Sequence, residues 1–444
     1  MSGQKSGPQS PSSFSTKVQW IATLAEQFPS EPLLNLSQVM DLDWFREAYR
    51  RTRKNGAVGV DGISSEQYSV QLEENLESLM NRIRSGTYRA PPVRRTYIEK
   101  DGGKSQRPLG IPTFEDKVAQ QAISMVLTPI YERMFLDCSW GYRPGRSAHG
   151  ALSALQGAAI KLKTGQGWVI DLDVQKFFDK LNHHWLQEFL SKRIRDRTIV
   201  RMIGRWLNAG VMEDGLWSAS EAGTPQGGVI SPLLANIYLH EALDTWFEQE
   251  VRPRLRGASH MSRYADDAVI LLENKEDADR VLAVLHKRFA KYGLQLHPEK
   301  TKLVDFRRPY FKSNRKSHHP GTFEFLGFNI HWEKTRAGRS SPKLKTAKSR
   351  IQRALGRVSE WCRKNRHKPV RDQHKTLSAK LRGHCEYFGV RGNSAGVGRV
   401  VEGAKAIWFK WLARRSGRRT FSWEAFRLLC ARYPLKSHMR QVPA

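Results

Sequence analysis

The sequence predicts an α+β fold, with strands and helices mixed over its first three quarters and helices alone after that. Apolar strand-like runs begin or end at acidic residues, as in 168–173 and 266–272. Amphipathic stretches with helical spacing, such as 277–292, separate these runs. From residue 345 onward the periodic segments are all helical. The chain of 444 residues, 39% hydrophobic, is long enough for two or three domains.

The charge of the chain indicates a large polyanionic partner, for which nucleic acid fits best. The net charge is +31, far more than solubility requires. It is uneven, because residues 336–444 hold 28 Lys or Arg against 5 Asp or Glu. Aromatic residues lie among these cations: Trp361, Tyr387, Phe388, Trp408, Phe409, Trp411, Phe421 and Trp423. The mixture suits phosphate contact with base stacking, although core packing explains any single aromatic better, and we expect the tryptophans 408, 411 and 423 to form the core of a helical bundle.

The cysteines and the hydropathy pattern favour a soluble, cytoplasmic protein with no membrane partner. Cys138, Cys362, Cys385 and Cys430 are too far apart in sequence for a paired-cysteine zinc motif, so reduced thiols are expected. No run reaches the roughly 18 apolar residues of a membrane span, and the N-terminus has no signal-peptide core.

The N-terminal region divides into a tail and two helices. We expect residues 1–35 to be a disordered tail, because the first 16 are rich in Ser, Gly, Pro and Gln. Amphipathic patterns predict helices over 36–53 and 65–85, within an N-terminal extension that covers 36–90.

A hairpin is predicted over 97–112, where Asp-Gly-Gly supplies the turn. Its cations Lys100 and Arg107 suit the triphosphate of a bound nucleotide, although ordinary solvated charges would look the same. A helix follows over 114–135.

Basic and glycine-rich loops each lead into a helix. In 141–150, Arg143 and Arg146 suit the backbone of a nucleic-acid template, and Ser147 is a candidate N-cap. His149 has no partner nucleophile in view, which favours a structural role. In the loop before the apolar helix that ends near 238, Gln226 and Gly227 suit close approach to a nucleotide or a template base.

A strand predicted over 168–173 ends in Asp173, and two aromatics follow it. Phe178 lies where a ring would press on the sugar C2′ and exclude a ribose hydroxyl, although a core position explains it equally well; for Phe177 the core is favoured. Asp171 lies deeper in the same strand and Asp179 follows the aromatics, so neither is expected in the site.

The adjacent carboxylates Asp266 and Asp267 precede an apolar run, which predicts a tight hairpin turn at the end of a buried sheet. Oxygen ligands favour a hard cation such as Mg²⁺. With Asp173 as the third ligand, two Mg²⁺ ions about 3.5–4 Å apart would activate a primer 3′-hydroxyl and stabilise the pyrophosphate leaving group. The alternative is that the acidic pair caps an ordinary surface turn.

Beyond the acidic pair, a helix over 277–292 stops at Gly293, and a strand is predicted over 294–304. Lys300 suits protonation of the leaving pyrophosphate, although a solvated lysine is as good an explanation. The alternation in 323–330 predicts a hairpin strand that would hold the primer terminus, and 313–348 is expected to be a flexible basic connection.

The ordered set of motifs resembles the group II intron-encoded reverse transcriptases with maturase function, of the bacterial branch that lacks an endonuclease. The resemblance covers about residue 36 to the end. Its motifs are Lys-Asp-Gly-Gly with Arg-Pro-Leu-Gly-Ile-Pro (100–112), Gly-Tyr-Arg-Pro-Gly-Arg-Ser (141–147), the Asp173 strand, Thr-Pro-Gln-Gly (224–227), Tyr-Ala-Asp-Asp (264–267), Pro-Glu-Lys-Thr-Lys (298–302) and Phe-Leu-Gly-Phe (325–328).

The resemblance implies a right-hand polymerase, with fingers and palm over 91–335 and a helical thumb or maturase domain over 336–444. It implies metal binding by Asp173, Asp266 and Asp267, and nucleotide binding by Lys100, Arg107, Phe178 and Gln226. The implied partners are intron RNA or another RNA template, a DNA target that serves as primer, and deoxynucleotides. The chain stops at Ala444 without the Cys- and His-containing nuclease domain of many relatives, so second-strand cutting is not expected.

Three alternatives remain open at this stage. The protein could be a splicing factor whose polymerase activity is incidental, a reverse transcriptase domesticated for DNA repair, phage defence or CRISPR adaptation, or an RNA-dependent RNA polymerase, against which Phe178 weighs. The sequence does not give the cognate RNA, the DNA target, fidelity, processivity or oligomeric state.

Overall fold

A computed structural model describes residues 13–100, 105–213, 215–218, 227–310, 320–415 and 421–436, with the backbone alone at 100, 105, 107 and 217. The chain divides into two units. One comprises residues 1–155 and 170–303, and the other comprises 156–169 and 304–444. The later part of the chain thus divides at 303/304, while the boundary expected at 335 between palm and thumb stays a prediction.

Helices form the start of the first unit, and one of them corrects the predicted tail. Helix α1 (Phe14–Gln27) begins at Ser13, whose hydroxyl accepts a hydrogen bond from the Thr16 N–H. It packs on α2 (Leu42–Arg51) and α5 (Phe114–Tyr131) through buried Ile21 and Ala25. The prediction of disorder over 1–35 is wrong for this segment, because its apolar residues recur at helical spacing behind a polar start. The helices predicted over 36–53 and 65–85 are confirmed as η1 (Leu36–Val39), α2, α3 (Ser65–Ser69) and α4 (Leu72–Ser85).

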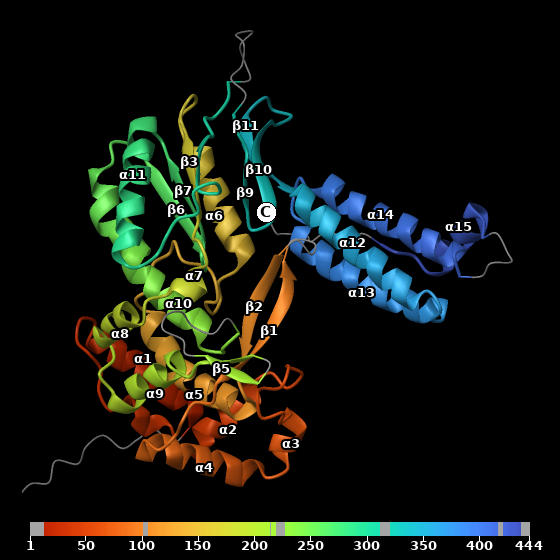
Figure 1. Cartoon of the computed structure of the whole chain (residues 1–444). Coiled ribbons are helices and arrows are strands. Elements are labelled where there is room, and N and C mark those ends of the chain that lie inside the picture. The colour runs from red at the N-terminus through yellow and green to blue at the C-terminus, as the bar shows by residue number, and fades with distance from the viewer. Residues whose placement is uncertain are drawn as a thin grey trace, which may run out of the picture. The chain divides into compact units, whose positions relative to one another are not determined.

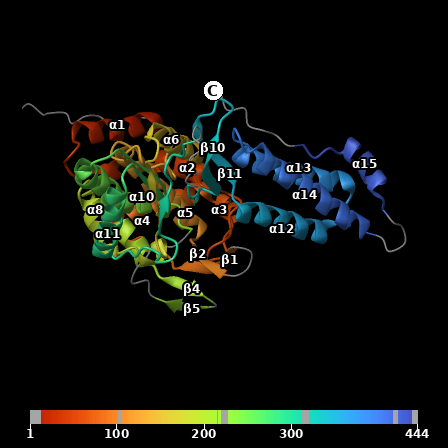
Figure 2. The ribbon, with the colours of Figure 1, turned by 90° about the horizontal axis from the view of Figure 1, so that it is seen from above.

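The predicted hairpin is confirmed as β1 (Val93–Lys100) and β2 (Ser105–Ile111), which pair antiparallel. Its turn lies outside the described residues. Strands β4 (Val211–Glu213) and β5 (Leu216–Ser218) extend it into a sheet with the order β2-β1-β4-β5 (Figure 2).

A second sheet has the order β6-β7-β3-β8 and carries the predicted acidic residues. Its strands are β3 (Trp168–Asp173), β6 (Ser259–Tyr264), β7 (Asp267–Leu272) and β8 (Lys302–Asp305). Every residue of β7 after Asp267 is buried, and α11 (Lys275–Lys291) packs against this strand (Figure 1). The strand predicted over 294–304 is found only at its end, as β8.

The remaining helices of this part of the chain are α6 (Ala148–Lys161), α7 (Phe177–Lys180), α8 (His183–Ser191), α9 (Arg197–Leu207) and α10 (Ser231–Leu239). Helix α10 continues through two wide π-helical segments, η2 (His240–Asp244) and η3 (Phe247–Val251), into the short η4 (Arg252–Arg254). The predicted cap of α6 is confirmed, because the Gly150 N–H donates to the Ser147 hydroxyl at 3.1 Å.

The second unit contains a three-stranded sheet where a flexible connection was predicted. Strands β9 (Phe323–Phe325), β10 (Phe328–Lys334) and β11 (Ser340–Thr346) pair antiparallel in the order β11-β10-β9. The prediction over 313–348 is wrong for the described residues from 320, because apolar side chains alternate with polar ones along β10, and Phe328, Ile330 and Trp332 are buried. The segment 323–330 is a complete hairpin turn rather than one strand.

Helices α12 (Lys348–Asn365), α13 (Val370–Phe388) and α14 (Ser394–Ala413) lie side by side, and α15 (Trp423–Arg432) follows (Figures 1 and 2). The predicted bundle is confirmed. Trp408 is fully buried and its indole N–H donates to the Gln373 side chain at 3.0 Å. Trp411 is only partly buried, and the core prediction is wrong for Trp423, which is 50% exposed and stacks on Phe409.

The sequence also led to expectations about the cysteine thiols and about membrane-spanning helices. All four cysteines carry free thiols. Among the helices within the described ranges, none combines the length and the apolar composition that a bilayer crossing requires.

Candidate active site

The hairpin between β6 and β7 presents the paired carboxylates. Tyr264 pairs with Asp267, so Ala265 and Asp266 form a two-residue turn, which confirms the predicted tight hairpin. Ala265 adopts φ +57°, a conformation that favours glycine and costs an alanine about 1–3 kcal/mol. Asp266 is half-buried and Asp267 is exposed at the start of β7.

Asp173 is the last residue of β3, and the segment before β8 encloses its backbone. The carbonyl of Asp173 accepts from the His297 N–H at 2.8 Å, and its own N–H donates to the Thr301 hydroxyl at 3.3 Å. This segment brings the Lys300 ammonium within 3.5 Å of the Asp173 carboxylate. The structure therefore brings together two of the predicted residues, Asp173 and Lys300.

The sheet and helix α10 relate Asp173 to the acidic turn. Strand β7 is the neighbour of β3. Four residues after Asp173, the ring of Phe177 contacts Tyr238 of α10, with centroids 6.2 Å apart. Arg263, next to the turn, donates to the side chain of Asn236 of the same helix. Phe177, which follows β3, and Arg263, near the end of β6, thus contact α10 at residues two positions apart.

The carboxylates suit a hard cation whose remaining ligands come from substrate and water. They do not form a site that encloses a cation with protein ligands alone. Within the described ranges, no three His, Cys, Asp or Glu side chains are grouped so that they could hold a metal ion by themselves. Asp173 is 39% exposed, and a cation, Lys300, already pairs with it. Mg²⁺ is commonly bound through one or two carboxylates with the rest of its shell supplied by water and substrate phosphates.

The two aromatics after β3 occupy different environments. Phe177 is buried, which confirms its predicted core position. Phe178 is half-buried beside it, with ring centroids 5.3 Å apart. Lys176 adopts φ +48° and turns the chain sharply between the strand and these aromatics. The role of Phe178 as a sugar gate stays a prediction.

The predicted nucleotide contacts from other loops are only partly visible. Lys100 lies on β1 and Arg107 on β2, but their side chains lie outside the described atoms, as does the whole of Gln226. Gly227 is described, with φ +124°. A Cβ on Gly227 would lie 2.7 Å from the carbonyl oxygen of Gly110, so only glycine lets this loop pack on β2.

A buried polar network that the sequence analysis missed holds the start of α10. The Asp116 carboxylate accepts hydrogen bonds from Tyr88, Trp206 and Gln120 at 2.6–2.9 Å. The Gln120 side-chain carbonyl in turn accepts from the Ile230 N–H at 3.4 Å. Burial raises the pKa of Asp116 to about 6. The available signal was the i, i+4 spacing of Asp116 and Gln120 on the apolar face of a helix.

The structure corrects one of the two predicted template contacts. Arg143 is buried, and its guanidinium donates to Glu132 and to the carbonyls of Leu136 and Ser139. The template prediction is therefore wrong for Arg143, whose donors are used to hold its own loop. Arg146 pairs with the exposed Asp137 at 2.6 Å and lies over the Trp140 ring, so it stays a candidate.

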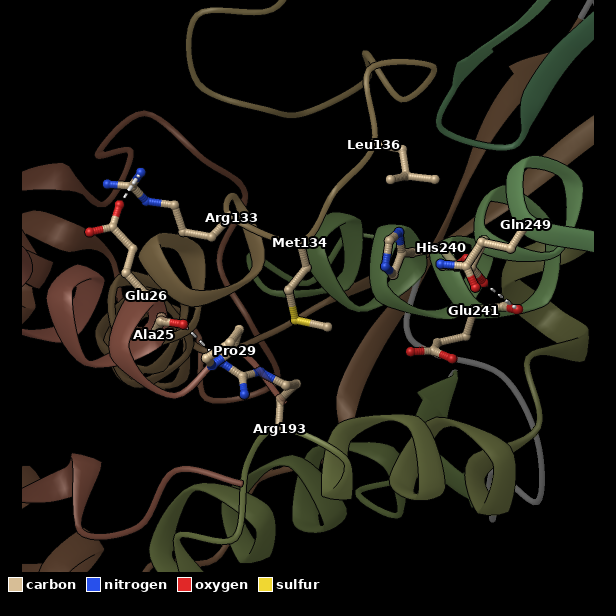
Figure 3. A pocket seen from close by; sticks show the side chains of 11 residues that line it. Ala25, Glu26, Pro29, Arg133, Met134, Leu136, Arg193, His240, Glu241 and Gln249 are labelled. Atoms are coloured by element: carbon tan, nitrogen blue, oxygen red, sulfur yellow. Dashed lines mark hydrogen bonds and ion pairs between the residues drawn. The ribbon is translucent and has the colours of Figure 1, made fainter. Parts of the chain in front are cut away.

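A pocket of about 680 Å³ is lined by other residues, whose side chains Figure 3 shows. Arg193, Arg133 and Met134 border it together with His240 and Glu241. The buried Arg193 guanidinium donates to the carbonyls of Ala25, Phe28 and Glu31, which end helix α1 and the loop after it. None of the residues predicted from sequence lines this cavity.

Comparison with known families decides the identity of the chain. The family described as reverse transcriptase (RNA-dependent DNA polymerase) matches residues 98–330, more than half of the 444 residues. The chain belongs to the reverse transcriptase family. The range that matches this family contains β3, β6 and β7, and therefore all three predicted catalytic aspartates.

Individual reverse transcriptase relatives narrow the resemblance to intron-encoded proteins. The group II intron-encoded protein LtrA of Lactococcus lactis is 35% identical over 256 residues, 55% of this chain and 42% of LtrA. Protein YkfC of Escherichia coli is 34% identical over 56% of this chain and 74% of YkfC. The Arabidopsis thaliana protein named nuclear intron maturase 2, mitochondrial, is 28% identical over 31% of this chain and 24% of its own length. The match therefore spans less than half of LtrA, and it confirms the predicted likeness to group II intron reverse transcriptases.

Proposed function

We propose that this protein is an RNA-directed DNA polymerase that also binds group II intron RNA, assists its splicing and copies it at a DNA target. One observation carries the polymerase proposal. Asp173 ends β3, and the neighbouring strand β7 begins at the strained turn of Asp266 and Asp267. Carboxylates at adjacent strand ends, within a reverse transcriptase match, suit a shared divalent-ion site.

The two units suit the parts of a right-hand polymerase. We assign the β6-β7-β3-β8 sheet to the palm, the β1-β2 hairpin to the fingers, and helices α12 to α14 to the thumb and maturase domain. The assignment rests on the carboxylates of the first sheet, the cations of the hairpin and the basic composition of the bundle. Figure 1 allows each part to be followed along the chain.

The chemistry divides between bound ions and side chains. Two Mg²⁺ ions, when bound, would activate the primer 3′-hydroxyl and neutralise charge on the phosphates. Asp173, Asp266 and Asp267 would hold them from two strands of one sheet. Lys300, 3.5 Å from Asp173, supplies a cation and a proton donor at the same place, where the leaving pyrophosphate needs both.

Primer extension tests the polymerase proposal. The wild-type chain should extend a DNA primer on an RNA template when Mg²⁺ and deoxynucleotides are present. Asp266→Asn keeps the shape of the side chain but removes its charge, so extension should fall by about 10³-fold or more. Asp279→Asn is the matched control, because Asp279 is exposed on α11 and lies in no part of the site. Undiminished extension by Asp266→Asn would refute the metal assignment.

Splicing of intron RNA tests the second half of the proposal. Its support is the likeness to LtrA and to the plant maturase, together with the excess of cations beyond residue 336. RNA binding does not need the acidic turn, so Asp266→Asn should still stimulate splicing of its intron. Loss of both activities in this variant, with folding intact, would contradict the separation of the two functions.

A further inference from the structure

Arg263 is fully buried and lies two residues before Ala265, the first residue of the acidic turn. Its guanidinium donates from Nε and Nη2 to the two carboxylate oxygens of Asp244, at 2.7 and 2.5 Å. Asp244 is fully buried as well. From Nη1, Arg263 donates to the carbonyl oxygen of Ala265 at 3.0 Å. The buried Arg263–Asp244 ion pair is therefore hydrogen-bonded, through Arg263, to Ala265, the residue of the turn with the strained backbone.

The remaining donors of Arg263 connect the turn to two other segments. Nη1 also donates to the Asn236 side-chain oxygen at 2.9 Å, and Nη2 donates to the Ser139 hydroxyl at 2.7 Å. Asn236 donates in turn to the carbonyl of Gly141 at 2.7 Å. A guanidinium has five N–H groups, and these contacts give each of them an acceptor.

Gly141 completes the enclosure of the turn. A Cβ at this position would lie 2.5 Å from the Ala265 backbone nitrogen, so the absence of a side chain allows the loop to press against the turn. Ala265 is itself buried. The turn is thus supported by a hydrogen bond on its carbonyl and by backbone contact on its nitrogen.

The π-helical segment η2 explains how one helix supplies both Asn236 and Asp244. An α-helix turns about 100° per residue, so residues eight apart point about 80° away from each other, whereas residues seven apart differ by about 20°. The Thr245 N–H bonds to the His240 carbonyl, five residues back, which is the spacing of a π-turn. Because the π-turn contains one residue more than an α-helical turn, Asp244 lies where a residue seven positions after Asn236 would lie in a regular α-helix. Asp244 and Asn236 therefore point to the same side of the helix. Single π-turns within α-helices often mark functional sites.

We propose that Arg263, Asp244 and Asn236 form a positioning network that holds the Ala265–Asp266 turn in its strained conformation, and so fixes the carboxylates for catalysis. Buried ion pairs are a poor source of stability, because desolvation offsets their attraction. A strained turn persists only where its surroundings over-determine it. The network supplies that restraint, and none of its members touches substrate. The proposal rests on the polymerase function proposed above.

The main test removes both charges together. In the double variant Arg263→Met with Asp244→Leu, no buried charge is left unpaired, so the fold should persist, but Ala265 loses its hydrogen bond. We expect kcat for primer extension to fall about 10- to 100-fold, with KM for deoxynucleotide and for primer-template within about twofold. Hydrogen exchange of the backbone over 262–270 should accelerate. The matched control is Arg252→Met with Glu248→Leu, an ion pair of the same helical stretch that does not contact the turn.

Adding Ala265→Gly to the double variant distinguishes positioning from general packing. Glycine adopts a positive φ without strain, so the turn would no longer need its restraint. This third substitution should recover a large part of the lost kcat. If the double variant does not fold, Arg263→Lys serves instead, because its single ammonium keeps a charge opposite Asp244 but cannot contact all four residues that accept from Arg263. The same loss and the same recovery are expected.

The outcomes separate this inference from the polymerase proposal. An unchanged kcat and unchanged exchange in the folded variants would overturn it, as would a loss that Ala265→Gly does not relieve. If the wild type shows no RNA-templated synthesis, the polymerase proposal fails first. Exchange over 262–270 then decides the positioning role without any activity measurement.

Discussion

Strained residues gather around the proposed active site. Among the described residues, five that are not glycine have positive φ, and three of them are Tyr142, Lys176 and Ala265. Lys176 follows Asp173, Ala265 precedes Asp266, and Tyr142 stands in the loop that presses on the turn. Such conformations cost free energy and persist where packing enforces them. The strain therefore lies where the side chains must be aimed.

A single-residue prediction concerns Phe178 and the choice between deoxynucleotides and ribonucleotides. If its ring excludes the ribose 2′-hydroxyl, Phe178→Ala should lower the discrimination between deoxynucleotides and ribonucleotides about tenfold or more, measured as the ratio of their kcat/KM values. The partial exposure of the ring next to buried Phe177 permits this contact. Tyr310→Ala, an exposed aromatic elsewhere, is the control. Equal discrimination in wild type and variant would remove Phe178 from the gate.

Sequence patterns predicted residues whose role follows from local spacing, and failed where the partners are backbone carbonyls or side chains distant in the sequence. The hairpin at Asp266 was predictable, because alternation and an acidic pair suffice to place it. The burial of Arg143 was not, since its acceptors are carbonyls that only the folded loop brings together. Asp116 was missed because two of its donors, Tyr88 and Trp206, lie 28 and 90 residues away in the sequence.

At the scale of elements, α10 organises the site. Its start is held by Gln120 and Asp116, and Tyr238 near its end contacts Phe177. Asp244, in the π-helical segment that follows, pairs with Arg263. Helical and hairpin periodicity predicted most elements. It missed α1 behind a polar start. It predicted the strand character of 323–330 but missed the rest of β10 and all of β11, where polar residues and the lysines of β11 concealed the alternation. It cannot reveal a π-turn, which differs from an α-helix by a single residue.

The Asp116 network predicts a specific pattern of rescue. In Asp116→Asn, the new amide would donate toward Gln120, whose side chain must flip, and the Ile230 N–H then faces another donor. KM for deoxynucleotides should rise, because the loop of Gly227 precedes Ile230. Adding Gln120→Glu supplies an acceptor both to that amide and to the Ile230 N–H, and should lower KM again. Absence of rescue in the folded double variant would show that the network does not act on this loop.

The raised pKa of Asp116 also predicts a pH dependence of stability. The folded-state pKa of about 6 exceeds the ordinary value of 3.8, so the folded protein binds the proton more tightly than the unfolded chain. The contribution of Asp116 is therefore largest below about pH 4 and is lost as the pH rises through about 6, on the order of 3 kcal/mol. The melting temperature of the wild type relative to Asp116→Asn should fall across this window. A constant difference would contradict the shift.

On the scale of the whole molecule, the largest excess of positive charge and the proposed active site lie in different parts of the chain. The acidic site lies within 170–303, whereas the greatest excess of cations lies beyond 336. The excess was plain from composition, and it predicts electrostatic capture of RNA. The division of the chain at 303 was not predictable, because it depends on which neighbours the β9-β10-β11 sheet finds.

RNA binding by the full chain should be strongly salt-dependent. Each Lys or Arg that neutralises a phosphate adds about −0.7 to the slope of log K against log salt for single strands. Lys380→Ala with Arg382→Ala removes two exposed cations of α13 and should reduce the slope by about 1.4. Titration by fluorescence anisotropy at several salt concentrations measures this. An affinity that is insensitive to salt would contradict an electrostatic interface.

The most direct test of the shared ion site is cleavage of the backbone by bound iron. Fe²⁺ in place of Mg²⁺, with ascorbate and peroxide, generates radicals that cut the chain near the ion, and mass spectrometry locates the cuts. If the three carboxylates surround one site, cuts should occur both near 173 and near 266. Excess Mg²⁺ should prevent the cuts by competition, and Asp266→Asn should suppress them at both places. Cuts confined to one of the two segments, or unaffected by Asp266→Asn, would contradict a common site.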